Sequence, residues 1–416
     1  MSLDALRGFD MFWIIGADAL VKALRSMSDT GLTSQMATQL EHVDWEGFRF
    51  YDLIFPLFVF IVGVSLVFSL TRTIQEVGRG EALMRVFRRS LLLFVIGILY
   101  SGGFKSGWPD IRIMGVLNRI ALAYFFAGML FCFFKPRALI GICAGLLVGY
   151  WALVTFTPIR DIALDKAALV KAAEERGDVQ SATALEGRGN PSTVKNSSAW
   201  AAAEKVFYGT TNRVRGDLHE KGFNVVNHFD FQYLPGKKWD LYWDPEGILS
   251  TIPAVATCLL GVFAGFWLRN PNATETKKFS MLLVAGIAGI VLGRLWGLEF
   301  PIVKKIWTSS YVLLAGGYSA LLLGLFYLVV DVMKFQKWCQ PFVWIGMNSI
   351  TIYLVKNIIG GDFRDLASRF VGGDIKTFLD EHVAKGAGSM LLSVVGLGLA
   401  FWFVHFLYKR KIFLRL

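Results

Sequence analysis

Residues 52–70 read DLIFPLFVFIVGVSLVFSL, and after Asp52 this stretch contains no charged side chain. A bilayer core about 30 Å thick requires roughly 20 consecutive apolar residues in a helix, so the stretch predicts a membrane span. The composition agrees, because 54% of the 416 residues are hydrophobic and only 18% are charged, whereas soluble domains are about a quarter charged. We therefore predict an all-α integral membrane protein, a polytopic bundle of about ten transmembrane helices with one long external insert. The candidate spans are 8–24, 52–70, 89–104, 114–134, 138–157, 248–268, 279–297, 308–331, 341–360 and 389–408.

The predicted spans divide the chain into three parts. Residues 1–157 hold the first five spans, residues 158–247 form a hydrophilic insert, and residues 248–416 hold the last five spans. Lys and Arg are more abundant in the short loops on the side of both chain ends, which favours cytoplasmic termini and a periplasmic insert. The first apolar run has no small-residue cleavage site, so we expect a retained span. No targeting extension or large N-terminal domain is recognisable, which favours a bacterial inner (plasma) membrane.

The basic residues and the cysteines exclude other classes of protein. The formal net charge is +11, but the basic residues cluster between apolar runs, which indicates contact with anionic membrane lipid and argues against nucleic acid. Three of the four cysteines lie within apolar runs and the fourth lies at the edge of one, without CxxC spacing; they are Cys132, Cys143, Cys258 and Cys339. We therefore expect buried thiols, with no disulfide framework and no metal site.

Charged side chains inside spans are candidates for function, because their burial in lipid is costly and they usually face a cavity or a partner. Asp10 and Asp18 lie eight residues apart in the first span, on roughly one face of a helix, and Asp52 opens the second span. Others occur in later spans, namely Arg119, Arg294, Lys356 and His405. For each of them, a structural ion pair explains the residue as well as a catalytic role does.

His42 stands directly before the second span, in HVDWEG at residues 42–47. A histidine beside acidic residues at a membrane boundary suits general base catalysis, because its proton is exchanged near neutral pH. Considered alone, however, a histidine in a loop is more often structural than catalytic.

Several blocks of the chain together resemble the heparan-α-glucosaminide N-acetyltransferase family and its bacterial relatives. The matching blocks follow the family's order over most of the chain, apart from the insert and the last span; they are SLDALRGFDMFWIIG (2–16), HVDWEGFRFYDLIFPLFVFIVG (42–63), IRIMGVLNRIALAY (111–124), DPEGILSTIPAVATCLLGVFAG (244–265), the stretch around 305–311, and WIGMNSITIYL (344–354). The resemblance implies that acetyl-CoA is engaged from the cytoplasmic side. The acetyl group then passes to the amine of a terminal glucosamine on the opposite side.

The resemblance also assigns roles to particular residues. The family's essential histidine matches His42, and its aspartate before the Phe-Pro pair matches Asp52. The Asn-Ser pair of its late helix matches Asn348 and Ser349.

Three positions depart from the family's pattern. The family often has Asn where this chain has Asp18, Glu46 replaces the Asn that usually follows the tryptophan, and Lys356 stands where the lysosomal enzyme has a histidine. These departures concern the identity of the substrate more than the reaction class.

Transfer to an amine requires a base, and His42 is our candidate. An acid next to it would fix the imidazole tautomer and stabilise the imidazolium, and both Asp18 and Asp52 are candidates for this catalytic role. The tetrahedral oxyanion requires hydrogen-bond donors, and the candidate donors are Asn348, Ser349 and Arg119.

The two substrates require further groups. Cations on the cytoplasmic side would hold the phosphates of acetyl-CoA, and the candidates are Arg72, Arg85, Arg88 and Arg89, although orientation in the membrane explains them equally well. Asp244 and Glu246, where the insert returns to the membrane, are candidates for binding sugar hydroxyls. Helix capping is the alternative interpretation of both.

The sequence leaves other functions open. An O-acyltransferase that modifies an envelope glycan would use the same chemistry, and a sugar transporter or permease would explain the charges in the spans. A transporter does not explain the histidine block as a unit, and no paired broken helices are recognisable. Direct transfer and a ping-pong route through acetyl-histidine are both open. We expect membrane lipid and an amino-sugar or glycan acceptor as partners, and a homodimer stays open.

Overall fold

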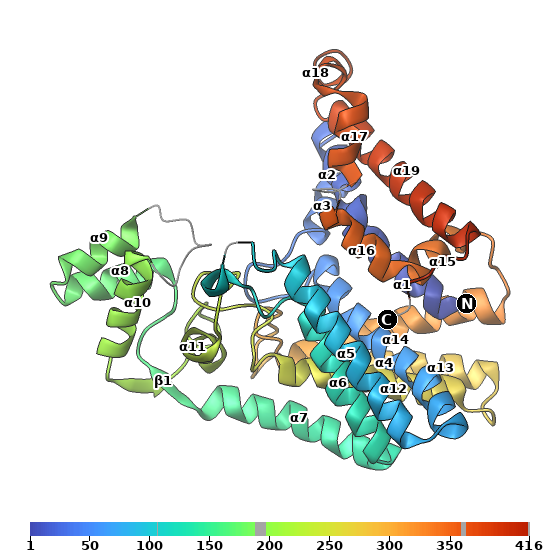
Figure 1. The fold of residues 1–416 in the computed structure, drawn as a ribbon, viewed down its shortest axis with the longest axis horizontal. Coiled ribbons are helices and arrows are strands. Elements are labelled where there is room, and N and C mark those ends of the chain that lie inside the picture. The colour runs from blue at the N-terminus through green and yellow to red at the C-terminus, as the bar shows by residue number, and fades with distance from the viewer. Residues whose placement is uncertain (106, 188–196, 359–362, 415–416) are drawn as a thin grey trace.

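The computed structural model describes residues 1–105, 107–187, 197–358 and 363–414. It is an all-α membrane protein in which long helices form a bundle and the insert lies at one end of it (Figure 1). The bundle comprises α1 (Ser2–Phe12), α2 (Asp18–Met27), α3 (Gly31–Gln39), α4 (Phe50–Glu76), α5 (Arg79–Tyr100), α6 (Val116–Phe133), α7 (Pro136–Phe156), α12 (Thr251–Arg269), α13 (Glu275–Trp296), α14 (Ser309–Phe326), α15 (Gln340–Met347), α16 (Ser349–Ile358), α17 (Phe363–Val371), α18 (Gly373–His382) and α19 (Ala387–Lys409). Short segments η1 (Trp13–Ala17), η2 (Trp108–Asp110) and η4 (Tyr327–Val332) complete it.

Seven helices in the described ranges are long and apolar enough to cross a membrane. They are α4, α6, α7, α12, α13, α14 continued to Val332, and α19. Along α13, exposed apolar side chains such as Val284, Ile287 and Leu295 cover most of the surface. Exposure of so much apolar surface to water would be unfavourable, whereas contact with lipid chains suits it.

The other three predicted spans have a different construction. The span predicted at 8–24 is interrupted at Gly16, whose φ of 130° separates α1 from α2. The span predicted at 341–360 is divided at Asn348 between α15 and α16, and its last two residues lie outside the described residues. The span predicted at 89–104 is the second half of α5, a helix whose first half is rich in charge. The described residues therefore contain seven uninterrupted apolar helices, whereas ten spans were expected.

The centre of the bundle is the contact of α4 with α12. Glycines lie at this crossing, where a Cβ on Gly63 would collide with the carbonyl of Cys258, and one on Gly261 with the carbonyl of Phe60. Small residues allow two membrane helices to approach backbone to backbone, so that dispersion contacts hold them together. The four cysteines are buried free thiols, as predicted.

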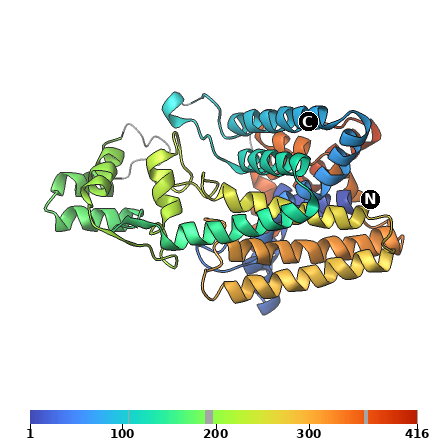
Figure 2. The ribbon, with the colours of Figure 1, turned by 90° about the horizontal axis from the view of Figure 1, so that it is seen from below.

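The insert folds into short helices around an apolar core that it shares with Trp45, with Tyr150 and Val154 of α7, and with the loop at 300–306. Its elements are β1 (Pro158–Arg160), α8 (Lys166–Glu175), α9 (Val179–Glu186), α10 (Ser198–Gly209), β2 (Arg213–Arg215) and α11 (Val225–Tyr233). β1 pairs antiparallel with β2, with Ile159 opposite Val214. Asp165 caps α8 by accepting a hydrogen bond from the backbone N–H of Ala168 at 3.0 Å. The insert and the N-terminus lie at opposite ends of the bundle in both views (Figures 1 and 2).

Candidate active site

A cavity of about 520 Å³ runs along one side of α4 inside the bundle. Its lining on α4 extends from Tyr51 to Ser65, which corresponds to about 21 Å at a rise of 1.5 Å per residue. His42 lines the cavity next to the start of α4. Arg7 also lines it and donates a hydrogen bond to Ser65 Oγ at 2.7 Å, four turns further along α4. The cavity therefore joins a potential base to a cationic region.

The sequence predicted that either Asp18 or Asp52 would lie next to His42, and in the structure Asp52 does so. His42 Nδ1 lies 2.9 Å from Asp52 Oδ1, and the Asp52 side chain is 1% exposed. We assign the Nδ1 proton to this hydrogen bond, because an ionised carboxylate only accepts. The assignment leaves a lone pair on Nε2, which lies 3.4 Å from Lys304 Nζ; this tautomer is the form of histidine that can act as a base at Nε2.

The start of α4 fixes the orientation of Asp52. Asp52 Oδ2 accepts hydrogen bonds from the backbone N–H groups of Arg49 at 3.2 Å and Val43 at 3.3 Å, so it caps the helix while Oδ1 faces His42. Pro56 has no N–H to donate to the Asp52 carbonyl four residues earlier. The hydroxyl of Tyr311 donates to that carbonyl instead, at 2.8 Å, and ties α14 to this turn.

Lys304 completes the cluster. Its Nζ lies 3.2 Å from Asp52 Oδ1 and 2.8 Å from His42 Nδ1, and it lines the same cavity. A bridge between Glu46 and Val303 and a hydrogen bond from the N–H of Gly47 to the carbonyl of Ile302 join the two loops. Burial lowers the pKa of Lys304, and the charge of Asp52 opposes this shift.

Asp18, the second predicted partner of His42, lies elsewhere. It forms an ion pair with Lys22 one turn later in α2, at 3.0 Å. It is also not among the cavity-lining residues of the described chain. Asp52 and not Asp18 is therefore the aspartate next to His42.

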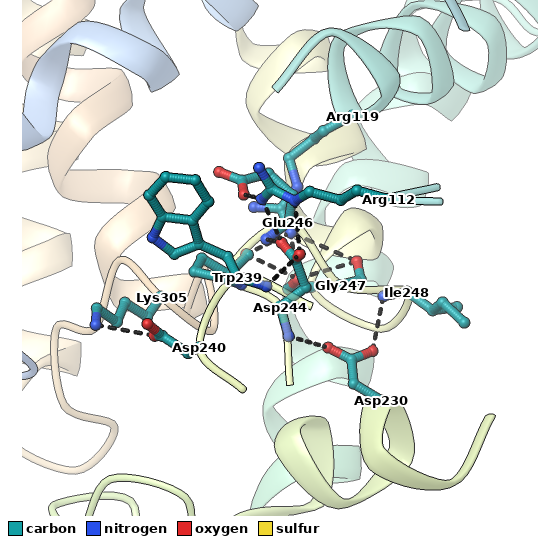
Figure 3. Close-up of polar contacts among 12 residues, drawn as sticks. Arg112, Arg119, Asp230, Trp239, Asp240, Asp244, Glu246, Gly247, Ile248 and Lys305 are labelled. Atoms are coloured by element: carbon teal, nitrogen blue, oxygen red, sulfur yellow. Dashed lines mark hydrogen bonds and ion pairs between the residues drawn. The ribbon is translucent and has the colours of Figure 1, made fainter. Parts of the chain in front are cut away.

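The DPEG turn at residues 244–247 is held from several sides (Figure 3). Arg112 donates to both oxygens of Asp244, at 2.9 and 2.8 Å, and to Glu246 Oε2 at 2.8 Å. Against desolvation by burial, these hydrogen bonds and charges raise the pKa of Arg112. Asp230 accepts from the backbone N–H groups of Asp244 and Ile248, and burial raises the pKa of Asp230 to about 7.

Within this turn, the two predicted sugar-binding acids differ in position. Asp244 is buried and bound by Arg112, so it holds the turn together. Glu246 lines the cavity with His42 and Lys304, and burial together with the charge of Asp244 raises the pKa of its carboxyl group. Of the pair, only Glu246 faces the space that a substrate would occupy.

Arg119 belongs to the turn and not to the cavity. Its guanidinium donates to the carbonyl of Pro245 at 2.8 Å and to the hydroxyl of Ser250, and it is fully buried. It also stacks on the Trp307 ring at 4.8 Å. Arg119 thus connects α6 to the re-entry of the insert, which differs from the expected oxyanion role.

The Asn348–Ser349 pair stands at the break between α15 and α16. Asn348 Nδ2 donates to the carbonyl of Trp344 at 3.2 Å, and Oδ1 is buried without a hydrogen-bond partner among the described atoms. Ser349 lines the cavity, whereas Asn348 does not. The side chain of Lys356, later in α16, lies outside what the structure describes.

The four predicted donor-binding arginines separate into two pairs. Arg85 and Arg89 line the cavity, with Arg85 donating to Thr73 Oγ1 at 2.9 Å and Arg89 lying 5.0 Å from the centre of the Tyr124 ring. Arg72 and Arg88 are exposed and form ion pairs on their own helices, with Glu76 and Glu81 at 2.8 Å each. The geometry therefore retains Arg85 and Arg89 as phosphate-binding candidates.

Comparisons with known proteins show what this chain is similar to. The sequence model of the family described as "Heparan-alpha-glucosaminide N-acetyltransferase, catalytic" matches residues 1–169. The chain is 28% identical to heparan-alpha-glucosaminide N-acetyltransferase of Mus musculus over 397 residues, which cover 90% of this chain and 56% of the mouse protein. For the Homo sapiens protein the identity is 28% over 411 residues, with 90% and 55% covered. The chain is therefore similar to this family over most of its length. It spans about half the length of these relatives.

The resemblance that the motifs predicted is thereby confirmed. The part matched by the heparan-alpha-glucosaminide N-acetyltransferase model contains His42, Asp52, Arg85 and Arg89, whereas Lys304 lies beyond it. In the residues that the structure covers, no three His, Cys, Asp or Glu side chains are grouped so that they could hold a metal ion.

Two cationic residues that line the cavity, Arg7 and Lys304, were not among the predicted site residues. Arg7 was counted only as a marker of orientation, although it stands in the matching block 2–16. Lys304 was counted in the same way, although it directly precedes the matching stretch around 305–311. Both residues could have been predicted from the sequence, because each is a charged residue inside or directly next to a block that matches the family.

Proposed function

We propose that the protein is a transmembrane acyltransferase that moves an acetyl group from cytoplasmic acetyl-CoA to the amine of a glucosamine-type sugar on the opposite side. The single observation that carries this proposal is the cavity that joins the His42–Asp52 pair to Arg7, Arg85 and Arg89. Coenzyme A has its phosphates and its thioester at opposite ends of a long arm. A cavity with cations at one end and a base at the other suits a donor of that shape.

The base would act on the acceptor. His42 Nε2 takes a proton from the amine as the amine nitrogen attacks the thioester carbonyl, and Asp52 stabilises the imidazolium that forms. The tetrahedral intermediate then collapses with cleavage of the C–S bond. The imidazolium returns its proton to the departing thiolate, so the products are an amide and free coenzyme A. We favour this direct route because it needs His42 only as a base and requires no second nucleophile.

Two cavity residues suit the remaining tasks. Among the three predicted oxyanion donors, Ser349 is the one that lines the cavity, and its hydroxyl can donate to a developing negative charge. Glu246 has Oε2 bound by Arg112, and it lies where the acceptor amine or a sugar hydroxyl would reach the base.

The topology forms part of the proposal. The insert and the N-terminus lie at opposite ends of the bundle (Figures 1 and 2), which supports termini on one side and the insert on the other. The excess of Lys and Arg near the termini assigns that side to the cytoplasm. The exposed apolar residues of the second half of α5, such as Leu92, Val95 and Leu99, support α5 as a further span. With α1–α2 and α15–α16 as interrupted spans, the total is about ten, in a bacterial inner membrane.

Product analysis tests the function. Purified protein is incubated with acetyl-CoA labelled in the acetyl group and with a panel of amino sugars and their hydroxyl analogues. The proposal expects an N-acetyl amide and stoichiometric free thiol. An ester product would assign the chain as an O-acyltransferase of a glycan. Unchanged acetyl-CoA with every acceptor, together with sugar flux in proteoliposomes, would assign a transporter.

A further inference from the structure

We propose that Lys304 is a positioning residue for His42, because its charge holds Asp52 as a carboxylate and keeps the imidazole of His42 as a neutral base. The proposal rests on the proposed function for its consequence in catalysis. Its structural part concerns only where a proton resides in the cluster of His42, Asp52 and Lys304.

The hydrogen-bond inventory of the cluster, in which Lys304 Nζ also lies 3.4 Å from His42 Nε2, favours one arrangement. Nδ1 of His42 cannot both donate to Asp52 and accept from Lys304, yet it lies 2.9 Å from the first and 2.8 Å from the second. Asp52 Oδ1 can accept from both neighbours at once, since a carboxylate oxygen has two lone-pair positions. Lys304 then donates to Oδ1 at 3.2 Å. In this arrangement the positive charge of Lys304 lies next to the neutral imidazole of His42.

The charges explain why the cation matters. A buried carboxylate without a counter-charge gains a proton or draws one from a neighbour. If Lys304 were neutral or absent, His42 would be the remaining partner of Asp52, and it would become an imidazolium. A protonated histidine cannot accept the proton of an incoming amine.

The loop that carries Lys304 is fixed in place. Trp307 has a positive φ of 53°, a conformation that bulky residues rarely adopt. The indole of Trp307 donates to Thr257 Oγ1 at 3.0 Å, and the N–H of Val303 donates to Thr308 Oγ1 at 3.1 Å. A loop held in a strained conformation by buried contacts presents Lys304 in one orientation.

The other charged groups around His42 are farther away or already paired. Arg49 donates to the carbonyl of His42 at 3.4 Å and pairs with Glu41 at 3.8 Å. The Tyr51 ring lies 4.8 Å from the imidazole, centre to centre, and Glu246 shares the cavity while bound to Arg112. Lys304 is therefore the cation that governs the proton of His42.

Titration of His42 by NMR tests the proposal without any substrate. The chain has five histidines, so ring labelling gives few signals, and the signal that His42→Gln removes is assigned. Lys304→Gln should raise the titration midpoint of His42 by about one pH unit, since a neighbouring like charge is lost. Lys304→Arg should keep the wild-type midpoint. Lys305→Gln is the matched control, because Lys305 pairs with Asp240 at 3.0 Å, and it should leave the midpoint unchanged.

Kinetics supply the second readout. The acid limb of the pH profile of kcat/KM should move with the titration midpoint of His42. At pH values below the wild-type midpoint, kcat/KM of Lys304→Gln should therefore be about tenfold lower than that of the wild type, and well above this midpoint it should be little changed. An unchanged His42 midpoint in Lys304→Gln, with the variant folded, would overturn the proposal. If that variant does not fold, a lowered His42 midpoint in Lys304→Arg or a raised one in Lys305→Gln would overturn it. Absence of acetyl transfer in the wild type, with the NMR shift intact, would refute the function and leave the role of Lys304.

Discussion

Replacing Asp52 by Asn should disable the base while preserving the start of α4. The amide oxygen can still accept from the N–H groups of Arg49 and Val43, which Asp52 Oδ2 accepts now. The NH₂ group would then face His42 Nδ1 and donate to it. The ring proton would move to Nε2, the atom that should act as the base. The same substitution next to the histidine of a Ser-His-Asp triad costs about 10⁴-fold in kcat.

The structure sets the expected magnitude for this variant. His42 is 52% exposed, so water can solvate either tautomer and part of the loss is recovered. We expect kcat to fall by about 10²–10⁴-fold, which corresponds to about 3–5.5 kcal/mol of barrier. The KM for acetyl-CoA should change little, because the cationic end of the cavity is about 21 Å away along α4.

Steady-state assays of thiol release measure this effect, and thermal unfolding in detergent checks the fold. Asp18→Asn is the matched control, since it makes the same substitution in an aspartate that pairs only with Lys22 among the described contacts. That variant should retain kcat within about twofold. A folded Asp52→Asn variant with wild-type kcat, or a large loss in Asp18→Asn, would refute the assignment of Asp52.

Three further predictions concern the donor, the topology and the insert. Arg89→Ala should raise the KM for acetyl-CoA, and Arg88→Ala should not, because of the two only Arg89 lines the cavity. Equal KM values in both variants would contradict the assignment of Arg89 to phosphate binding. Val179 in the insert and Val77 in the α4–α5 turn are both exposed. Cysteines substituted at these two positions should react with an impermeant reagent from opposite sides of the membrane. Labelling of both cysteines from one side would contradict the topology. Burial lowers the pKa of His228 to about 4, so the unfolded insert gains a proton below pH 6.5 that the folded insert does not. The stability of the insert should therefore fall by about 3 kcal/mol between pH 6.5 and 4. Hydrogen-exchange protection factors of α11, which are corrected for the pH dependence of intrinsic exchange, should fall with it, and unchanged protection factors would refute the shift.

The sequence predicts those parts of the site that are close together along the chain. His42 and Asp52 lie ten residues apart across one helix start, so a carboxylate that caps the helix can also reach the histidine. Asp18 was an equal candidate on sequence grounds. The break at Gly16 turns α2 away from the line of α1, and no periodicity of a straight helix anticipates it.

Lys304 could not be placed from a single sequence. It lies 262 residues after His42, and its contact depends on the bridge between two irregular loops. The burial of Arg119 and Asp244 is of the same kind. Arg119 in α6 donates to the turn before α12, and Asp244 in that turn accepts from Arg112, which lies before α6. Hydropathy does not register a single glycine or asparagine that breaks a helix, so it could not distinguish the spans predicted at 8–24 and 341–360 from uninterrupted helices.

The most direct test of the account is the acetyl-transfer rate of His42→Ala relative to wild type, measured with an amino-sugar acceptor as a function of pH. The account predicts a folded variant with an unchanged KM for acetyl-CoA and a kcat lower by about 10²–10⁴-fold at neutral pH. The deficit should narrow at higher pH, where more of the acceptor amine is already neutral. A folded His42→Ala variant that turns over at the wild-type rate across this range would contradict the account.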